Sequence, residues 1–441
     1  MGSTDSISSR STLLDLNFLK YNSTAALANF VQPIFTTFLS LLAVELGANV
    51  FEIGLIGGGA SVVYAFMPFV MGRFSDRGQA RKFFIILSLG LLATVSILYY
   101  FSANPIDLIA LRLVEGLGWA AFWPSIDSAV THDTKVDPKR ALAIFNLSWS
   151  SAASLGPIVG SFVIVIFSIR QVFIFNALFL LVAMSINLIP YSRIRRSRKI
   201  AQPSDSGAKE TILRETEITE NVEAAGIASN EGDKPSEKGS KKVSVLFYVL
   251  SLVVCTIISN TMVSFFSPYA RSQGLAIIVI GTISSTFSVA RFIGYLLTSN
   301  ERINNFLLDA RIRSRNILVF LFLVSLSSLL MVFHNPSGAI YFLSFGLVGL
   351  GYSFVYYIAM VGLLAETKKE RMGAGAGTFE TSIGMGSLAG PVIAGSVAGN
   401  SLTVPFIIPS LCAIPILGLL FFMSRSGGTP KLQFLSKQQT R

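Results

Sequence analysis

Long apolar runs separated by short polar segments dominate this chain. In the first half they occupy residues 18–45, 53–71, 83–101, 106–131, 141–167 and 171–191. In the second half they occupy residues 243–269, 277–297, 317–333, 339–364, 373–398 and 402–423. About 20 apolar residues in a helix cross the ~30 Å of hydrocarbon in a bilayer, so each run predicts one membrane-spanning helix. The pattern predicts an all-α membrane protein with twelve spans.

The composition agrees with a membrane protein and leaves other classes unsupported. The chain is 52% hydrophobic and 13% charged, and its formal net charge is +11. Lys and Arg are spread through short loops rather than gathered on one domain, so we expect no nucleic-acid partner. The two cysteines, Cys255 and Cys412, lie in apolar runs far apart in sequence and indicate no disulfide framework. No enzymatic constellation, Walker sequence or metal-spaced His/Cys cluster is present, so we expect neither an enzyme nor a cofactor nor a metal.

The basic residues predict the orientation in the cell membrane. They gather on one side of the predicted spans, at Lys135, Lys139, Arg140, Arg193, Arg195, Arg196, Arg198, Lys199, Lys368, Lys369 and Arg371. The opposite loops carry almost only Arg170 and Arg271. Short cytoplasmic loops are the ones enriched in Lys and Arg. The N-terminus, the central loop and the C-terminus are therefore predicted to be cytoplasmic.

A polar segment divides the chain. Residues 192–242 are rich in Ser, Glu, Lys and Gly and contain few hydrophobic residues. Such a composition predicts a flexible cytoplasmic linker between residues 1–191 and residues 243–441.

The two halves are related by an internal repeat. Residues 115–119, EGLGW, correspond to residues 348–352, VGLGY. With one residue of slippage, the pair Gly156-Pro157 corresponds to Gly390-Pro391. Two similar six-span halves predict pseudo-symmetry, with a site at the interface of the repeats.

A charged loop joins the second and third spans. It contains Gly72, Asp76, Arg77 and Arg81. Its G-x-x-x-D-R pattern resembles the signature loop of the major facilitator superfamily of transporters, although Ala80 occupies the first of the family's paired arginine positions. The resemblance implies the fold of that family, with two pseudo-symmetric six-helix halves that work by alternating access. It also implies a conformational lock between this loop and the start of the eleventh span, which includes Gly373 and Gly375.

Two further motifs carry the resemblance. Arg112 begins an R-x-x-x-G-x-G pattern in the fourth span, and Glu115 lies on the same helical face. The two residues form either a structural pair or part of a proton path. Gly156-Pro157 resembles the antiporter motif of proton-linked exporters and slightly favours export, although its repetition at Gly390-Pro391 is explained nearly as well by a hinge common to both halves. The ionisable candidates for coupling are Arg112, Glu115, Asp127 and Glu380.

Family architecture implies that the first, fourth, seventh and tenth spans line the substrate cavity. The midplane side chains on these spans are Asn29, Gln32, Trp119, Trp123, Asn260, Ser264, Tyr352 and Tyr356. Aromatic walls with a few amides suit an amphipathic or planar organic molecule. An aromatic stripe at helical spacing is also common in helix packing, so the alternative role is structural.

These observations predict a secondary active transporter that exports a small organic solute in exchange for protons. Its expected partners are the solute, the proton and the lipid bilayer, and we expect a monomer. The alternatives are an uptake permease for sugars or organic acids, or a membrane sensor that does not transport. The sequence leaves the solute, the coupling ion and the direction open.

Overall fold

The computed structural model describes residues 15–67, 80–132, 134, 136, 138–189, 236–309, 311–333, 338–366 and 372–426. The chain divides into two units, and the first comprises Met1–Pro190 and Lys242–Arg441. This first unit contains the helices that surround the cavity described below. The predicted linker lies almost entirely outside the described residues.

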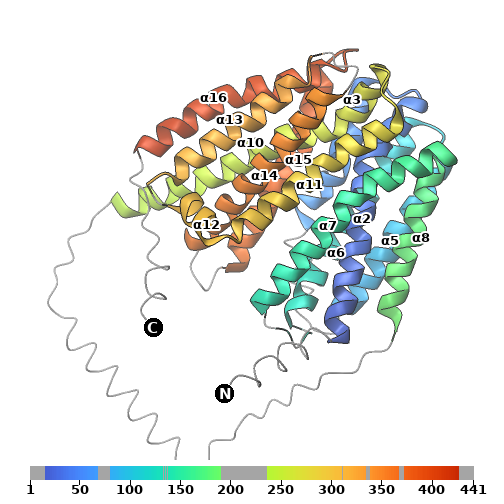
Figure 1. The fold of residues 1–441 in the computed structure, drawn as a ribbon, viewed down its shortest axis with the longest axis horizontal. Coiled ribbons are helices and arrows are strands. Elements are labelled where there is room, and N and C mark those ends of the chain that lie inside the picture. The colour runs from blue at the N-terminus through green and yellow to red at the C-terminus, as the bar shows by residue number, and fades with distance from the viewer. Residues whose placement is uncertain are drawn as a thin grey trace, which may run out of the picture. The chain divides into compact units, whose positions relative to one another are not determined.

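A helix lies at the position of every predicted span (Figure 1). The first half contains α2 (Leu16–Glu45), α3 (Val50–Tyr64), α5 (Ala80–Phe101), α6 (Pro105–His132), α7 (Pro138–Ile166) and α8 (Gln171–Leu188). The second half contains α10 (Ser236–Ser272), α11 (Ile277–Thr298), α13 (Arg313–Leu330), α14 (Ala339–Glu366), α15 (Met372–Val397) and α16 (Val404–Ser426). The described residues form no strand, and the predicted all-α class is confirmed.

The apolar character of these helices supports the membrane setting. Within the described ranges, 9 helices are long and apolar enough to cross a bilayer. The helices α3, α6 and α15 are not among them. The membrane-spanning nature of the chain is therefore confirmed, while the count of twelve crossings stays a prediction.

One short helix was not predicted from the apolar runs of the sequence. Helix α12 (Glu301–Leu308) follows α11, and the Asn300 side chain caps its first turn by accepting from the amides of Arg302 and Ile303. Only Leu307 and Leu308 are buried in its eight residues, so its apolar stripe is too short to register as a span. The hydroxyl of Tyr357 donates to Asn304 Oδ1 at 2.7 Å and ties α12 to α14.

Among the described residues, the most extensive contacts between the two halves are those of α3 with α15 and of α7 with α11. Both crossings bring a glycine of one half against a proline carbonyl of the other. A Cβ atom at Gly54 would lie 2.5 Å from the carbonyl oxygen of Pro391, and a Cβ atom at Gly281 would collide with that of Pro157. The predicted hinge residues Pro157 and Pro391 thus lie at equivalent contacts between the halves, where only glycine allows the backbones to approach this closely.

We expect Gly54→Ala and Gly281→Ala to lower the melting temperature of the purified protein, because each added methyl group forces the two halves apart. The matched control is Gly418→Ala in α16, where an added Cβ would meet nothing within 4 Å. There alanine improves helix propensity by up to about 1 kcal/mol, so its effect should be neutral or stabilising. Equal melting temperatures for all three variants would contradict the close contact.

Candidate functional site

A cavity of about 850 Å³ lies between the two halves. Four helices of the first half line it, namely α2, α3, α6 and α7. Four helices of the second half do the same, namely α10, α11, α14 and α15. A cavity of this size suits a small organic molecule.

All eight residues predicted to line a substrate path do border this cavity. They are Asn29, Gln32, Trp119, Trp123, Asn260, Ser264, Tyr352 and Tyr356. The rings of Trp119 and Trp123 stack with centroids 6.4 Å apart, and those of Tyr352 and Tyr356 stack at 5.9 Å. The repeat therefore places one stacked aromatic pair on each side of the cavity. Their contact with a solute stays a prediction.

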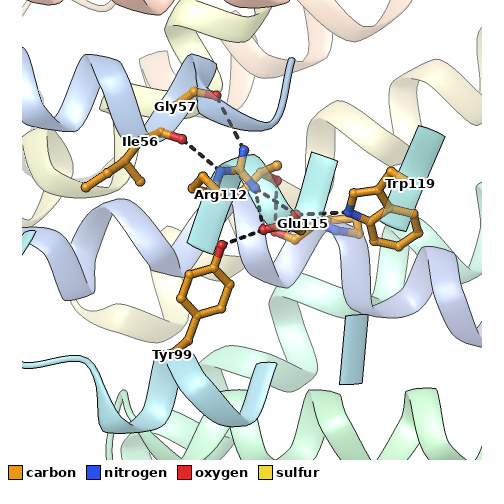
Figure 2. Close-up of polar contacts among 8 residues, drawn as sticks. Ile56, Gly57, Tyr99, Arg112, Glu115 and Trp119 are labelled. Carbon is orange, nitrogen blue, oxygen red and sulfur yellow. Dashed lines mark hydrogen bonds and ion pairs between the residues drawn. The ribbon is translucent and has the colours of Figure 1, made fainter. Parts of the chain in front are cut away.

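The four coupling candidates also border the cavity, and two of them form one polar cluster with neighbouring groups (Figure 2). Arg112 Nη1 donates to both carboxylate oxygens of Glu115, at 2.7 and 2.8 Å. The same carboxylate accepts from the Tyr99 hydroxyl at 2.8 Å and from Trp119 Nε1 at 2.9 Å. Arg112 Nε donates at 2.8 Å to the backbone carbonyl of Ile56.

This cluster links three helices and neutralises its own charges. Arg112 is 5% exposed and Glu115 is 1% exposed, so both ions are removed from water. A buried ion pair is tolerated when additional hydrogen bonds satisfy its remaining donors and acceptors. Tyr99 from α5 and the Ile56 carbonyl from α3 supply such bonds to α6. Of the two predicted roles for this pair, the geometry favours the structural one.

The other two coupling candidates come from opposite halves. Glu380 of α15 accepts a hydrogen bond from the Tyr64 hydroxyl of α3 at 3.0 Å. Asp127 of α6 lies close enough to Glu380 for their charges to interact. One side-chain hydrogen bond within the cavity therefore connects the halves directly through a carboxylate.

An arginine that sequence reasoning left outside the site also borders the cavity. Arg291 of α11 places its Cζ atom 5.2 Å from the ring centroid of Trp149 and 5.4 Å from that of Phe287. Its Nε is buried and has no hydrogen-bond partner among the described residues. Trp149 belongs to α7, the fifth span, whereas the family resemblance implies a cavity lined by the first, fourth, seventh and tenth spans. A charged residue inside an apolar run is the sequence signal that points to Arg291.

The predicted conformational lock falls mostly outside the described residues. Gly72, Asp76 and Arg77 lie there, whereas Arg81 belongs to α5. Gly373 and Gly375 belong to the first turns of α15. The lock remains a prediction.

The fold and cavity together define a helical membrane protein built from two halves around a central compartment. A sequence model of the Major Facilitator Superfamily matches residues 23–307, so the chain belongs to this family of transporters. A multi-drug resistance efflux pump PmrA homolog from Lactococcus lactis subsp. lactis (strain IL1403) is 26% identical over 179 residues. That match covers 39% of this chain and only 42% of the relative's length.

Solved structures show the same fold at low sequence identity. The nucleoside transporter NupG superimposes with a TM-score of 0.69 at 13% identity, covering 92% of this chain and 98% of that chain. A bacterial homolog of the human lysosomal transporter Spinster, in an inward-facing and occupied conformation, gives 0.67 at 14% identity over 92% and 96% of the two chains. At these identities the likeness concerns the fold alone.

We expect Glu115→Gln to destabilise the protein by about 3–5 kcal/mol, because Arg112 would keep a buried charge without its partner. The double variant Arg112→Met with Glu115→Leu should recover much of this loss, since it removes both charges together. Thermal unfolding of Arg112→Met, of Glu115→Leu and of the double variant in detergent measures the coupling. Effects of these two single variants that simply add in the double variant would contradict a structural pair.

Proposed function

We propose that this chain is a secondary active transporter that exports an organic solute by alternating access, in exchange for protons. The hydrogen bond between Tyr64 and Glu380 carries this proposal, because it joins the two halves inside the cavity through a titratable group. Glu380 lines the cavity and takes part in a contact between the halves, which supports it as the proposed coupling group.

Proton binding at Glu380 would change both its charge and its hydrogen-bonding capacity. An ionised carboxylate only accepts hydrogen bonds, whereas a carboxylic acid also donates one. Protonation would weaken a bond in which Tyr64 donates to a charged oxygen, since charge-assisted hydrogen bonds are the stronger ones. It would also remove the repulsion between Glu380 and Asp127. The balance between states of the two halves would therefore depend on the proton.

One observation supports export as the direction, because the relative from Lactococcus lactis is described as an efflux pump homolog. The Gly156-Pro157 pair of the exporter-like motif lies at a crossing between the halves, but Gly390-Pro391 lies at the equivalent crossing, so this contact does not set the direction. A second candidate function is uptake of an organic acid. Arg291 beside the cavity, which has no acidic partner among the described residues, fits such a solute in either direction of transport.

The orientation predicted from the basic loops completes the proposal. It puts the Tyr64 end of α3 and the Met372 end of α15 nearer the cytoplasm. Protons would then enter from the outside as solute leaves. We further propose that a monomer is sufficient, because residues of one chain, from both halves, line the cavity.

We expect Glu380→Gln to abolish accumulation driven by a pH gradient while leaving solute exchange intact, because the neutral amide cannot exchange a proton. A thermal-shift screen of drugs, sugars and organic acids first identifies a ligand, since a millimolar ligand of micromolar affinity adds about 4 kcal/mol to folded-state stability. Accumulation of that ligand is then measured in acid-loaded proteoliposomes.

The matched control is Glu301→Gln, a carboxylate of α12 that does not line the cavity. It should accumulate ligand like the unmodified protein. Full accumulation by Glu380→Gln would remove this residue from the coupling path. Failure of the unmodified protein to respond to any pH gradient would overturn proton coupling.

A further inference from the structure

Arg291 is a cavity-lining charge for which the described part of the chain provides no acidic partner. Arg112, the other arginine of the cavity wall, is paired with Glu115 at 2.7 Å. Arg291 has no such ion pair with any described residue, and its buried Nε lacks a hydrogen-bond partner there. An uncompensated charge within a membrane bundle is costly, and such residues usually serve a ligand path.

The aromatic neighbours hold this guanidinium without using its hydrogen-bond donors. The Arg291 Cζ atom lies over the rings of Trp149 and Phe287 at 5.2 and 5.4 Å. Attraction to the face of a ring requires charge but no N–H group. A guanidinium carries five N–H donors in a planar fork that matches a carboxylate. The ring contacts therefore fix the side chain and leave donors for a ligand.

The internal repeat explains why no carboxylate meets Arg291. Glu380 lies ten residues before Gly390-Pro391, and Asn146 lies ten residues before Gly156-Pro157. Asn146 of α7 thus corresponds to Glu380 of α15, and both line the cavity. Helix α7 packs against α11, which carries Arg291. The first half therefore offers a neutral amide on this side, and Asn146 Oδ1 already accepts from Trp149 Nε1 at 3.0 Å.

We propose that Arg291 binds an anionic group of the transported solute, so that the solute is an organic carboxylate with an apolar or aromatic body. Arg291 pairs with the carboxylate, and the stacked pairs Trp119–Trp123 and Tyr352–Tyr356 contact the body. This inference names the substrate class and so rests on the proposed transport function. The anionic group and the coupling proton use different side chains, Arg291 and Glu380.

The tryptophans of the chain provide a direct binding assay. The sequence contains 3 tryptophans, and Trp119, Trp123 and Trp149 all line the cavity. Intrinsic tryptophan fluorescence of the full chain in detergent micelles, which contain no other protein, therefore reports on this compartment alone. The probes are phenylbutyrate, its neutral amide and the cationic phenylbutylamine, which share one apolar body.

Phenylbutyrate should bind at least about tenfold more tightly than its amide, and phenylbutylamine should bind most weakly. Arg291→Gln should remove the preference for the carboxylate, while Arg291→Lys should retain part of it. Asn146→Glu should also reduce phenylbutyrate affinity, because it supplies Arg291 with the carboxylate that the first half lacks. This last variant keeps Arg291 in place and tests the inference if Arg291→Gln does not fold.

Arg313→Gln is the matched control, since Arg313 is also buried, lies over the Tyr248 ring at 5.5 Å and does not line the cavity. It should leave the carboxylate preference unchanged, with the melting temperature of each variant checking its fold. Absence of phenylbutyrate binding, equal affinity for the amide, tighter binding of the amine, or an unchanged preference in Arg291→Gln would each overturn the inference.

The binding assay tests the substrate class and the transport assay tests the proposed function, so their results distinguish the two proposals. A carboxylate preference without any pH-driven accumulation would refute the proposed function and support Arg291 as an anion site. Accumulation driven by a pH gradient without a carboxylate preference would refute only the substrate class.

Discussion

Each charge inside a bundle surrounded by hydrocarbon needs compensation, and this constraint orders the centre of the molecule. Charged side chains in the cavity wall are compensated in three different ways. Arg112 and Glu115 neutralise one another and recruit donors and acceptors from two further helices. Glu380 receives a single hydrogen bond from the opposite half. Arg291 has aromatic faces and no acid among the described residues. The less complete the internal compensation, the more a ligand or proton can change the energy of the site.

The close approach of the halves depends on backbone chemistry rather than on charge. At Gly54 and Gly281 the missing side chain allows one helix to touch a proline carbonyl of the other half. Proline at these points removes an internal hydrogen bond and makes the helix easier to bend. The repeat places the same combination on both sides, so the contact surfaces are nearly symmetric although the ionisable groups beside them are not.

The sequence predicted the fold well and the site only in part. Apolar runs and a repeat of the Gly-Pro pair are sufficient to expect paired bundles, because span length and repeat order depend on local composition. Trp119 and Tyr352 could be placed at the cavity through the family resemblance. Trp149 could not, because hydrophobicity on all sides hides which face of a buried helix turns inward. Arg291 stands out as a charge in an apolar run, but its neighbours on other helices could not be read from the sequence. The polar helix α12 was missed since it lacks an apolar run.

The two halves differ at one pair of corresponding positions in the cavity wall, and this difference bears on the proposed use of the cavity by two ions. At corresponding positions, α15 carries the carboxylate of Glu380 and α7 carries the amide of Asn146. Were both positions acidic, Arg291 would have a resident counter-ion nearby and an incoming anion would have to displace it. With asparagine in α7, Arg291 has no described acid on the helix that packs against its own, although Glu380 also lines the cavity. In the proposed mechanism this asymmetry assigns the solute and the proton to different side chains within one compartment, which is the arrangement that linkage between them requires.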